Sequence, residues 1–488
     1  MRQSHEPFQE RLNTLGRESK VGQEVFGMVL ARTSLRAPAE TSRWHLEKGD
    51  LQARPDDRRI LPQATVSKAV RVLLQTGLLE EGQLHQKSDD GRPVMPLRFG
   101  RNLVIAGVHI EQRRNTPCAI TVALVGLDSS LVFKTGNYSF RAPSKGDPWS
   151  FVAEKIHLHV LDLLSEIAED RVCAELPPVE LFGVGVEVGA PVHRGRVMPV
   201  PGSVITDPID FTGTLHKLFS TASPTGSAVP VVVENDVNAL AVLAIHQAHY
   251  SVSDLVVVGV YDEGVGGGLV MDGRLRRGGN GTAMELGHLP IGFAPGESGA
   301  TQLVTDGNHK TGLRRFEDPC WCGRLGHVDT RTTPSRICGE LGLKLSGFAG
   351  AARSTSPEAK AAFSYAGSVL GRAVAHVCNI VDPSRLVIFL PAPLLECADS
   401  DATGQSSAGS DYVEAARHEI KSAFANAGRD VNQYLTFQQF EVDPTAGAFL
   451  GARAAAVCVL ESFIEHALRV DGCRSTAQTP RTSVTGAA

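Results

Sequence analysis

A glycine-rich stretch, a Glu-x-x-His pair and a Cys-x-Cys-Gly knuckle follow one another within residues 263–327. They supply a carboxylate, an imidazole and two thiols, which belong to Glu285, His288, Cys320 and Cys322. The glycines before the carboxylate allow the main chain to come close to a ligand, because they carry no side chain. These residue types predict recognition of a polyol at a site braced by a metal ion.

Two cysteines and a histidine form the candidate metal site. Cys320, Cys322 and His288 are the soft or borderline ligands that Zn²⁺ prefers. An isolated Cys-x-Cys is more often a pair of ordinary thiols, so the zinc hypothesis depends on His288 joining them. Other cysteines stand alone in apolar stretches, which is typical of reduced, buried thiols: Cys118, Cys173, Cys378 and Cys458.

Length and composition set the class of the protein. A chain of 488 residues is too long for one ordinary domain and allows roughly three units. A hydrophobic content of 42% with 49 glycines fits a globular α/β protein. No apolar run approaches the roughly 20 residues of a membrane span, and the polar N-terminus lacks a signal-peptide core. We therefore expect a cytoplasmic protein that does not bind membranes.

The charge is distributed unevenly along the chain. Residues 1–100 carry 16 Lys and Arg against 13 Asp and Glu, whereas the remainder carries 32 against 40. A slightly basic N-terminal segment followed by an acidic remainder fits a nucleic-acid-binding module joined to a small-molecule-binding domain.

The front of the chain has the pattern of a winged helix-turn-helix over residues 21–100, after a flexible segment over 1–20. Helical patterns cover residues 25–30 and 41–50, and a third helix follows with one apolar face formed by Val66, Ala69, Val70, Leu73 and Leu74. A strand begins at Leu78 and Leu79, and a second strand over 94–100 follows the turn SDDGRP. The third helix of such a module can lie in the major groove of DNA.

Residues that suit DNA contacts lie near the start of the third helix, on its other face and in the wing. They are Gln63, Thr65, Ser67, Lys68, Arg71 and Arg92. The same periodicity is also typical of a helix that only packs against a core. The stretch over 49–60 contains Arg58 and Arg59, which either contact phosphates or belong to a solvated loop.

From about residue 103 onward, short Val/Leu/Ile-rich runs alternate with helical patterns. This alternation predicts an α/β architecture with largely buried strands. Asp236 comes at the end of one such strand, where its carboxylate can accept a hydrogen bond from a hydroxyl group, and Asn235 can both donate and accept. The alternative role for Asp236 is capping of the helix that follows. The tail over 471–488 is polar and is expected to be disordered.

Five motifs in the same order resemble the ROK family, which unites sugar-responsive repressors with sugar kinases. They are TVSKAVRVLLQTGLLEEG, VENDVNALA, EGVGGGLVMDGRLRRG, MELGH and CWCGRLGHVD. The chain resembles the repressor type, in which a winged helix-turn-helix precedes a two-lobed, actin-like sugar-kinase fold. The resemblance places that fold at residues 101–470.

The resemblance assigns roles to individual residues. It implies that Asp236 corresponds to the general base of the kinases, and that Glu285 and His288 hold the sugar. His288 also ligates zinc in the family, and His327 stands where the family has a third cysteine ligand. Asp329 stands where the family has a sugar-contacting Glu. The expected effector site is thus Asn235, Asp236, Glu285, His288 and Asp329, and the expected structural zinc site is His288, Cys320, Cys322 and His327. The stretch over 293–319 resembles an insertion.

Three features separate the chain from the kinases that it resembles. His109 stands where the kinases begin a phosphate-binding Asp-x-Gly-Gly-Thr loop, and no Gly-Gly-Thr follows it. Asp262 and Glu263 stand in the second phosphate loop, where a carboxylate repels phosphate. The late strand and the residues after it read RLVIFLPAPLL, with prolines where the kinases usually have glycines near adenosine. We therefore expect neither ATP binding nor enzymatic activity.

The sequence thus predicts a transcriptional repressor with a sugar, or sugar derivative, as allosteric effector. Its partners are a double-stranded DNA operator and further copies of itself, in a homodimer or homotetramer. Two alternatives stay open: a zinc-containing sugar kinase of the same fold, and a regulator that has lost sugar binding and responds to another signal.

Overall fold

The computed structural model describes residues 63–75, 79–82, 97–100, 102–113, 116–127, 132–141, 147–176, 178–199, 207–222, 229–247, 254–291, 320, 322–324, 326–398, 406–424, 430–440 and 446–469. Several features predicted from the sequence lie outside these residues: the segment over 1–20, the first two helices of the DNA-binding module, the stretches over 49–60 and 293–319, Arg92, and the tail over 471–488. The chain divides into two compact units. One contains the described residues up to Gly100 and those from Leu460, and the other comprises Arg101–Val459.

The smaller unit contains one helix and a β-hairpin before Gly100. Helix α4 (Gln63–Gln75) is followed by strands β1 (Leu79–Glu81) and β2 (Leu97–Phe99), which pair antiparallel. The expected apolar face is present, since Val70 and Leu73 of α4 are completely buried. The third helix and the two strands predicted from the sequence are therefore found, whereas the complete winged helix-turn-helix is not shown by the described residues.

The larger unit contains two five-stranded sheets with the same topology. The first sheet has the order β5-β4-β3-β6-β9, with strands β3 (Leu103–Arg113), β4 (Thr116–Gly126), β5 (Val132–Ser139), β6 (Glu180–Val188) and β9 (Val231–Asn235). The second has the order β12-β11-β10-β13-β14, with strands β10 (Leu255–Val260), β11 (Val265–Met271), β12 (Arg274–Leu275), β13 (Arg385–Leu390) and β14 (Leu435–Gln439). In each sheet, three antiparallel strands come first and two parallel strands are then added.

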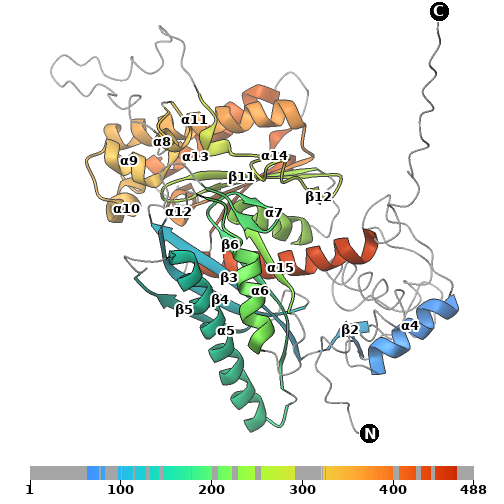
Figure 1. The fold of residues 1–488 in the computed structure, drawn as a ribbon. Coiled ribbons are helices and arrows are strands. Elements are labelled where there is room, and N and C mark those ends of the chain that lie inside the picture. Colours follow the sequence, from blue (N-terminus) through green and yellow to red (C-terminus); the bar gives the residue numbers. More distant parts are fainter. Residues whose placement is uncertain are drawn as a thin grey trace, which may run out of the picture. The chain divides into compact units, whose positions relative to one another are not determined.

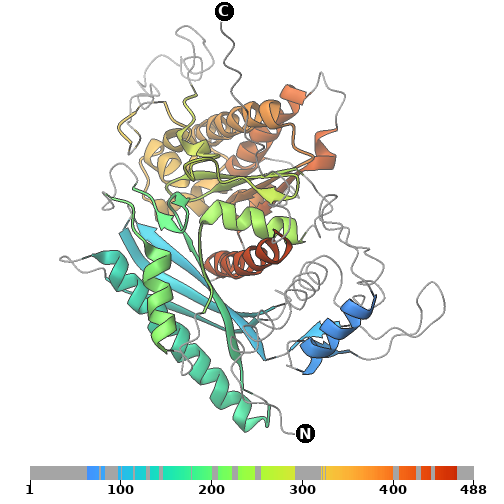
Figure 2. The same cartoon turned by 45° about the vertical axis from the view of Figure 1, so that its right-hand side comes forward.

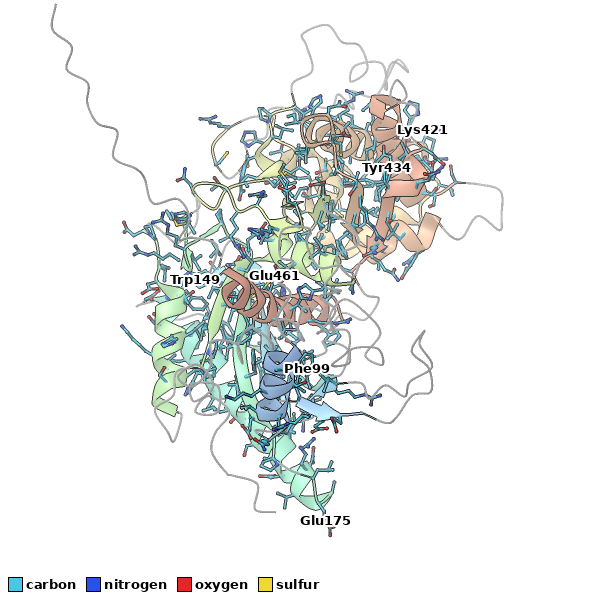
Figure 3. The ribbon with its side chains drawn as sticks, turned by 90° about the vertical axis from the view of Figure 1, so that its right-hand side faces the viewer. Phe99, Trp149, Glu175, Lys421, Tyr434 and Glu461 are labelled. Atoms are coloured by element: carbon cyan, nitrogen blue, oxygen red, sulfur yellow. The ribbon has the colours of Figure 1, made fainter. Side chains whose placement is uncertain are left out.

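Two helices cover one face of the first sheet and build its core. Helices α5 (Pro148–Cys173) and α6 (Phe211–Ala222) pack on alternate strand residues such as Val108 and Val186. Asp147 caps α5 by accepting hydrogen bonds from two backbone amides, and Pro148 suits the first helical position because it has no amide proton to leave unpaired. Trp149, near the start of α5, is 1% exposed and meets the Phe211 ring edge-to-face, whereas Glu175 lies beyond the far end of the helix (Figure 3).

The second sheet has an equivalent core on its own helices. Helices α11 (Pro357–Val381) and α13 (Ala408–Phe424) pack on Val256, Val258, Ile388 and their neighbours. Shorter elements complete the larger unit: β7 (Val192–His193), β8 (Arg196–Val197), η2 (Leu286–His288), α8 (Asp329–Thr332), α9 (Pro334–Glu340), η4 (Leu345–Gly347), α10 (Phe348–Ala352), α12 (Ala392–Ala398) and α14 (Val431–Tyr434).

Each sheet receives a helix that follows the last strand of the other sheet. Helix α7 (Asp236–Gln247) follows β9 of the first sheet but packs on β10 and β11 of the second. Helix α15 (Ala446–Arg469) follows β14 of the second sheet, and its residues up to Val459 pack on β3 and β6 of the first. In Figures 1 and 2, α15 accordingly lies between α7 and the first sheet. The exchange ties the two lobes together.

Glycines make these helix contacts close. A β-carbon at Gly107 of β3 would overlap the carbonyl of Ala452, and one at Gly185 of β6 would overlap that of Ala455. The backbone of α15 therefore lies directly on the sheet, an approach that only glycine allows. The same device appears in the second sheet, where Gly268 of β11 leaves room for α7.

The expectation of buried thiols is correct for Cys378 and Cys458 but wrong for Cys173, which is exposed, and Cys118 is only partly buried. Cys173 is the last residue of α5, next to Val172, whose exposed fraction is 72%, so this end of the helix no longer covers a core. Within the described part of the chain, no helix is both long and apolar enough to cross a membrane.

Candidate ligand cleft and metal centre

A cleft of about 1500 Å³ opens between the two lobes of the larger unit, where strands of both sheets end. The structure brings all five predicted effector residues to its wall: Asn235, Asp236, Glu285, His288 and Asp329. Clefts that combine apolar walls with a few convergent polar groups are typical of small-molecule sites, and this one is larger than the roughly 300–1,000 Å³ of an ordinary ligand pocket.

Asn235 and Asp236 hold the junction between β9 and α7. The Asn235 Oδ1 atom accepts hydrogen bonds from the amides of Val237 and Asn238, both at 3.1 Å, so Asn235 provides the capping interaction of α7. The Asp236 Oδ1 atom accepts from the Val237 amide at 2.8 Å and from Asn235 Nδ2 at 2.9 Å. Neither of these two bonds uses Oδ2 of Asp236.

The environment of Asp236 disfavours its negative charge. Burial raises the pKa of this carboxyl to about 7, and the nearby charge of Glu187 adds to the effect. The amide of Val237 and the imidazole of His109 act in the opposite direction, but they do not cancel it. Tyr261 forms a hydrogen bond with Asp236, and burial raises the pKa of the Tyr261 phenol, which is therefore protonated and donates.

A row of ionisable side chains crosses the first sheet beside this carboxylate. His109 of β3 is in register with Glu187 of β6, which is in register with Glu234 of β9. The Nδ1 atom of His109 bonds to Oε1 of Glu187, whose side chain is 3% exposed. Burial by itself lowers the pKa of His109, but the hydrogen bond and charge of Glu187 outweigh it and raise the pKa above the usual value.

Glu234 has its own partners. Its Oε2 atom accepts from Arg277 Nε at 2.6 Å, and its Oε1 atom accepts from the Asn235 amide at 3.0 Å and from Asn238 Nδ2 at 3.1 Å. Arg277 follows β12, and a polar loop connects it to Glu285. This ion pair thus anchors the loop that bears Glu285 to the strand that bears Asn235.

Glu285 and Asp329 come together where the glycine-rich strand β11 begins. Asp329 Oδ1 accepts a hydrogen bond from the Val265 amide at 2.7 Å. A β-carbon at Gly287 would overlap this carboxylate, so the turn that follows Glu285 needs glycine. Burial within the cleft and the charge of Asp329 raise the pKa of Glu285 to about 7, although its carboxyl reaches solvent. At neutral pH, Glu285 can therefore donate or accept a hydrogen bond.

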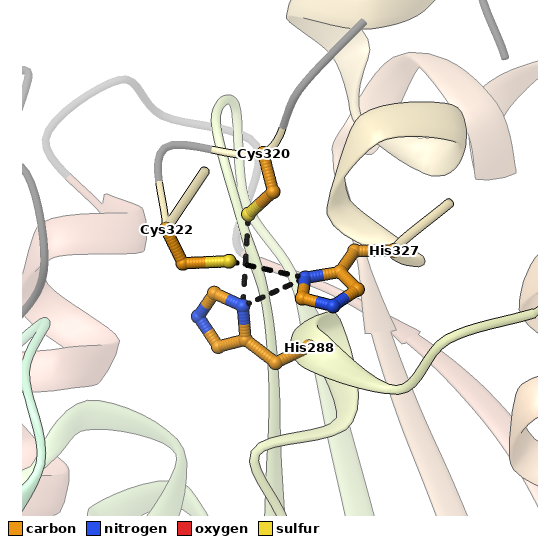
Figure 4. A group of neighbouring side chains, drawn as sticks. All are labelled: His288, Cys320, Cys322 and His327. Atoms are coloured by element: carbon orange, nitrogen blue, oxygen red, sulfur yellow. Dashed lines mark hydrogen bonds between the residues drawn. The ribbon is translucent and has the colours of Figure 1, made fainter. Parts of the chain in front are cut away.

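The predicted metal ligands lie together, and one of them, His288, also lines the cleft. His288, Cys320, Cys322 and His327 have all their ligand atoms within 4.8 Å of one another (Figure 4). The two Nδ1 atoms are 3.2 Å apart, Cys320 Sγ is 3.6 Å from His288 Nδ1, and Cys322 Sγ is 3.4 Å from His327 Nδ1. A tetrahedral zinc ion with ordinary bond lengths has N–N edges of roughly 3.3 Å and N–S edges of roughly 3.5 Å. The spacing therefore fits a four-coordinate ion.

The protonation of these groups also suits a metal site. Burial lowers the pKa of His288 and that of His327, so both imidazoles are neutral, as ligation requires. Burial raises the pKa of Cys320 to about 11, so a metal ion must displace a proton from this thiol. The knuckle is shaped by Gly323 and Gly326, which have φ angles of +83° and +78°. His288 lines the cleft as well, so an ion bound here fixes the turn that carries Glu285.

Comparison with known proteins identifies the domain that contains this cleft. The model of the ROK family matches residues 174–389. These residues are a ROK family domain. The match covers the second half of the first sheet, α7 and most of the second sheet, including both the predicted effector residues and the metal ligands.

The ROK domain has relatives among regulators and kinases. The DNA-binding transcriptional repressor Mlc of Escherichia coli (strain K12) is 22% identical over 366 residues, which is 70% of this chain and 76% of Mlc. A glucokinase of Halalkalibacterium halodurans is 27% identical over 163 residues, which is 33% of this chain and 48% of the glucokinase. The chain is thus homologous to a ROK regulator over a longer stretch than to this ROK kinase.

A solved structure shows the fold of the ROK domain. The crystal structure of a ROK family transcriptional regulator, a homologue of the E. coli MLC protein, superposes with a TM-score of 0.60 at 19% identity, covering 92% of this chain and 100% of that chain. The two lobes therefore have the α/β, actin-like fold of the ROK sugar kinases, and the fold predicted from the sequence is confirmed for this part of the chain.

The residues that differ from the kinase pattern expected from the sequence also line the cleft. His109, Asp262 and Glu263 line it, together with Pro391 and Pro393 after β13. The carboxylates thus lie in the same cleft as Asp236.

Several residues of the cleft and their partners were not predicted from the sequence, Tyr261 among them. Glu187 was not singled out, although an isolated carboxylate in a buried strand requires a partner. Arg277 and Met284 were missed as well. Met284 lines the cleft with a φ of +65°, which is unusual for a residue with a side chain, and nothing in the amino-acid pattern around it predicts this conformation.

Five of the six predicted DNA-contacting residues lie in α4. Lys68 and Arg71 are exposed and Ser67 is half-buried. Gln63 and Thr65 belong to the first turn of the helix, and their side chains are outside the described atoms.

Proposed function

We propose that the protein is a DNA-binding transcriptional repressor of genes for sugar uptake or metabolism, with a non-covalently bound sugar as its effector. The observation that carries this proposal is the similarity to the repressor Mlc over 366 residues. The convergence of Asp236, Glu285 and His288 on one cleft supports the choice of a sugar, whereas the side-chain amide of Asn235 is occupied by bonds within the protein. Hydroxyl groups both donate and accept, and these side chains offer both functions.

The proposed DNA contact is made by α4. Val70 and Leu73 face the core, so Lys68 and Arg71 are left on the exposed face, where cations can neutralise phosphates and guanidinium groups can read guanine. Gln63, Thr65, Ser67 and Arg92 complete the proposed contact set. Two such heads are required for a palindromic operator, so we propose a homodimer or homotetramer.

Zinc is the proposed metal, with a structural role. His288, Cys320, Cys322 and His327 would hold it, and the bound ion would fix the knuckle and the turn before His288. The two thiols favour zinc over magnesium or calcium, which prefer oxygen ligands.

Phosphoryl transfer is the competing function, favoured by the glucokinase relative and by the position of Asp236. The presence of Asp262 and Glu263 disfavours this function, because carboxylates in the cleft repel the phosphates of a nucleoside triphosphate. We propose that the chain has no kinase activity. A coupled assay that detects sugar-dependent ADP release from the metal-loaded protein would contradict this proposal.

Genome-wide binding followed by a gel shift tests the regulator directly. We expect discrete palindromic sites, binding that is lost in Lys68→Ala/Arg71→Ala, and release or tightening with one sugar of a panel. Lys217→Ala, at an exposed position of α6, is the matched control. The absence of enriched sites with folded protein would refute DNA binding. Thermal shift with the same panel tests the effector, since a ligand that binds only the native state raises the Tm.

A further inference from the structure

His109 pairs with a residue of its own protein and also lines the ligand cleft. It lies near the end of β3, in register with Glu187 and on the wall of the cleft that Asp236 also lines. Its Nδ1 atom is occupied by Glu187, and its side chain is 22% exposed. The ring nitrogen left for a ligand is therefore Nε2.

The ion pair between His109 and Glu187 is closely enclosed and has little room to move. Glu187 is 3% exposed, and within the described residues its second oxygen, Oε2, is buried without a hydrogen-bond partner. A carboxylate this deep requires a positive partner, so it holds His109 protonated with an N–H at both ring positions. Helix α15 closes the other side, because a β-carbon at Gly451 would overlap both Glu187 Oε1 and His109 Nδ1.

The charges around the imidazole come from two strands and the start of a helix. Glu187 of β6, Asp236 at the start of α7 and Glu111 of β3 all favour the protonated form, and burial opposes it. The negative charges of Glu187 and Glu285 in turn raise the pKa of Asp236. The imidazolium thus offsets the repulsion between the carboxylates of Glu187 and Asp236.

We propose that His109 is a direct contact for the effector and donates from Nε2 to the hydroxyl whose proton Asp236 accepts. This inference rests on the proposed sugar-binding function and names the ligand more narrowly. An oxygen held between a donor and an acceptor must itself accept and donate, which a free hydroxyl does. A phosphate ester at this oxygen cannot donate, and it brings negative charge against Asp236 and Glu187. The effector is therefore a sugar that is unphosphorylated at this hydroxyl.

The experiment uses the full-length protein and a panel of D-glucose, D-mannose, D-galactose, D-fructose and N-acetyl-D-glucosamine, each with its phosphates and deoxy analogues. Thermal shift selects the sugar, and calorimetry gives its Kd for the wild type and for His109→Leu/Glu187→Leu. The double substitution removes both partners, so that no buried charge is stranded. His216→Leu, at an exposed position of α6, is the control.

We expect the double variant to weaken binding of the selected sugar about tenfold or more, the usual cost of losing a charge-assisted hydrogen bond. The loss should disappear for the deoxy analogue that lacks this hydroxyl. An unchanged Kd overturns the proposal, and so does an equal loss for sugar and analogue, because the pair would then act only through the fold. Tighter binding of the corresponding phosphate overturns the ligand class.

A second readout needs no ligand. In protein labelled with ¹³C at histidine Cε1, the signal missing from the double variant identifies His109. Its titration midpoint should lie above the usual histidine value and fall in Glu187→Gln. A midpoint at or below the usual value refutes the imidazolium. If His109 titrates as expected and no sugar shifts the Tm, then the proposed effector function fails, and this contact fails with it.

Discussion

Replacing Asp236 with asparagine should stabilise the protein at neutral and alkaline pH. The folded protein raises the pKa of Asp236 from 3.8 to about 7, so the native state binds this proton more tightly than the unfolded chain does. Stability from this group is therefore complete below pH 4 and is lost as the pH rises towards 7. Asparagine keeps the shape and most hydrogen bonds of the side chain but carries no charge.

The magnitude follows from the size of the shift. One pKa unit corresponds to about 1.4 kcal/mol, so a rise from 3.8 to about 7 sets an upper limit of roughly 4 kcal/mol. Asp236 reaches the open cleft, where water screens its charge, and we expect about 1–2 kcal/mol for Asp236→Asn at pH 8.

Urea unfolding at pH 5.5 and 8.0 measures this effect. The advantage of Asp236→Asn over the wild type should grow by about 1 kcal/mol between the two pH values, because only the wild type ionises further at this position. Asp170→Asn, an exposed substitution in α5, should change the unfolding free energy by less than about 0.5 kcal/mol at both pH values. The reasoning would be refuted if Asp236→Asn were less stable than the wild type at pH 8.0. It would also be refuted if the difference in unfolding free energy between the two proteins did not change with pH.

Three further results are expected. Cys320→Ser should reduce bound zinc well below one ion per chain, as measured by mass spectrometry of the purified protein. Cys338→Ser changes a buried cysteine outside the cluster and should retain the zinc. Equal zinc in both variants would exclude the cluster as the zinc site. Gly451→Ala should lower the unfolding free energy by about 1–3 kcal/mol, because the added methyl group overlaps Glu187 and His109. Gly350→Ala places its methyl group in open space and should be neutral or slightly stabilising. Similar effects at both positions would contradict the close packing of α15. In the native protein, Cys173 should react with a maleimide well before Cys378 or Cys458, and a uniform reaction rate would contradict their burial.

The sequence predicts best those features whose parts are close together along the chain. The apolar face of α4, the strand before Asp236 and the Glu285–His288 turn can each be read from fewer than 20 residues. The metal cluster spans 40 residues, and here the resemblance to a family supplied His327.

Other features depend on contacts that local patterns do not encode. His109 and Glu187 are 78 residues apart, and only the parallel register of β3 and β6 brings them together. The pattern of α7 and α15 indicates helices but not which sheet each will cover. Cys173 has an apolar neighbour, yet α5 extends past the sheet before it reaches that residue.

The exchange of helices between the lobes has a consequence for synthesis on the ribosome. Strands β3 and β6 are complete once residue 188 has been made, but the helix that covers their second face ends its contact only at Val459. At the usual elongation rate, this separation takes roughly 15–50 s. During that interval the nascent first lobe keeps its glycine-lined face and the Glu187 carboxylate uncovered, so it is a natural client for chaperones, and a chain truncated before α15 is expected to aggregate.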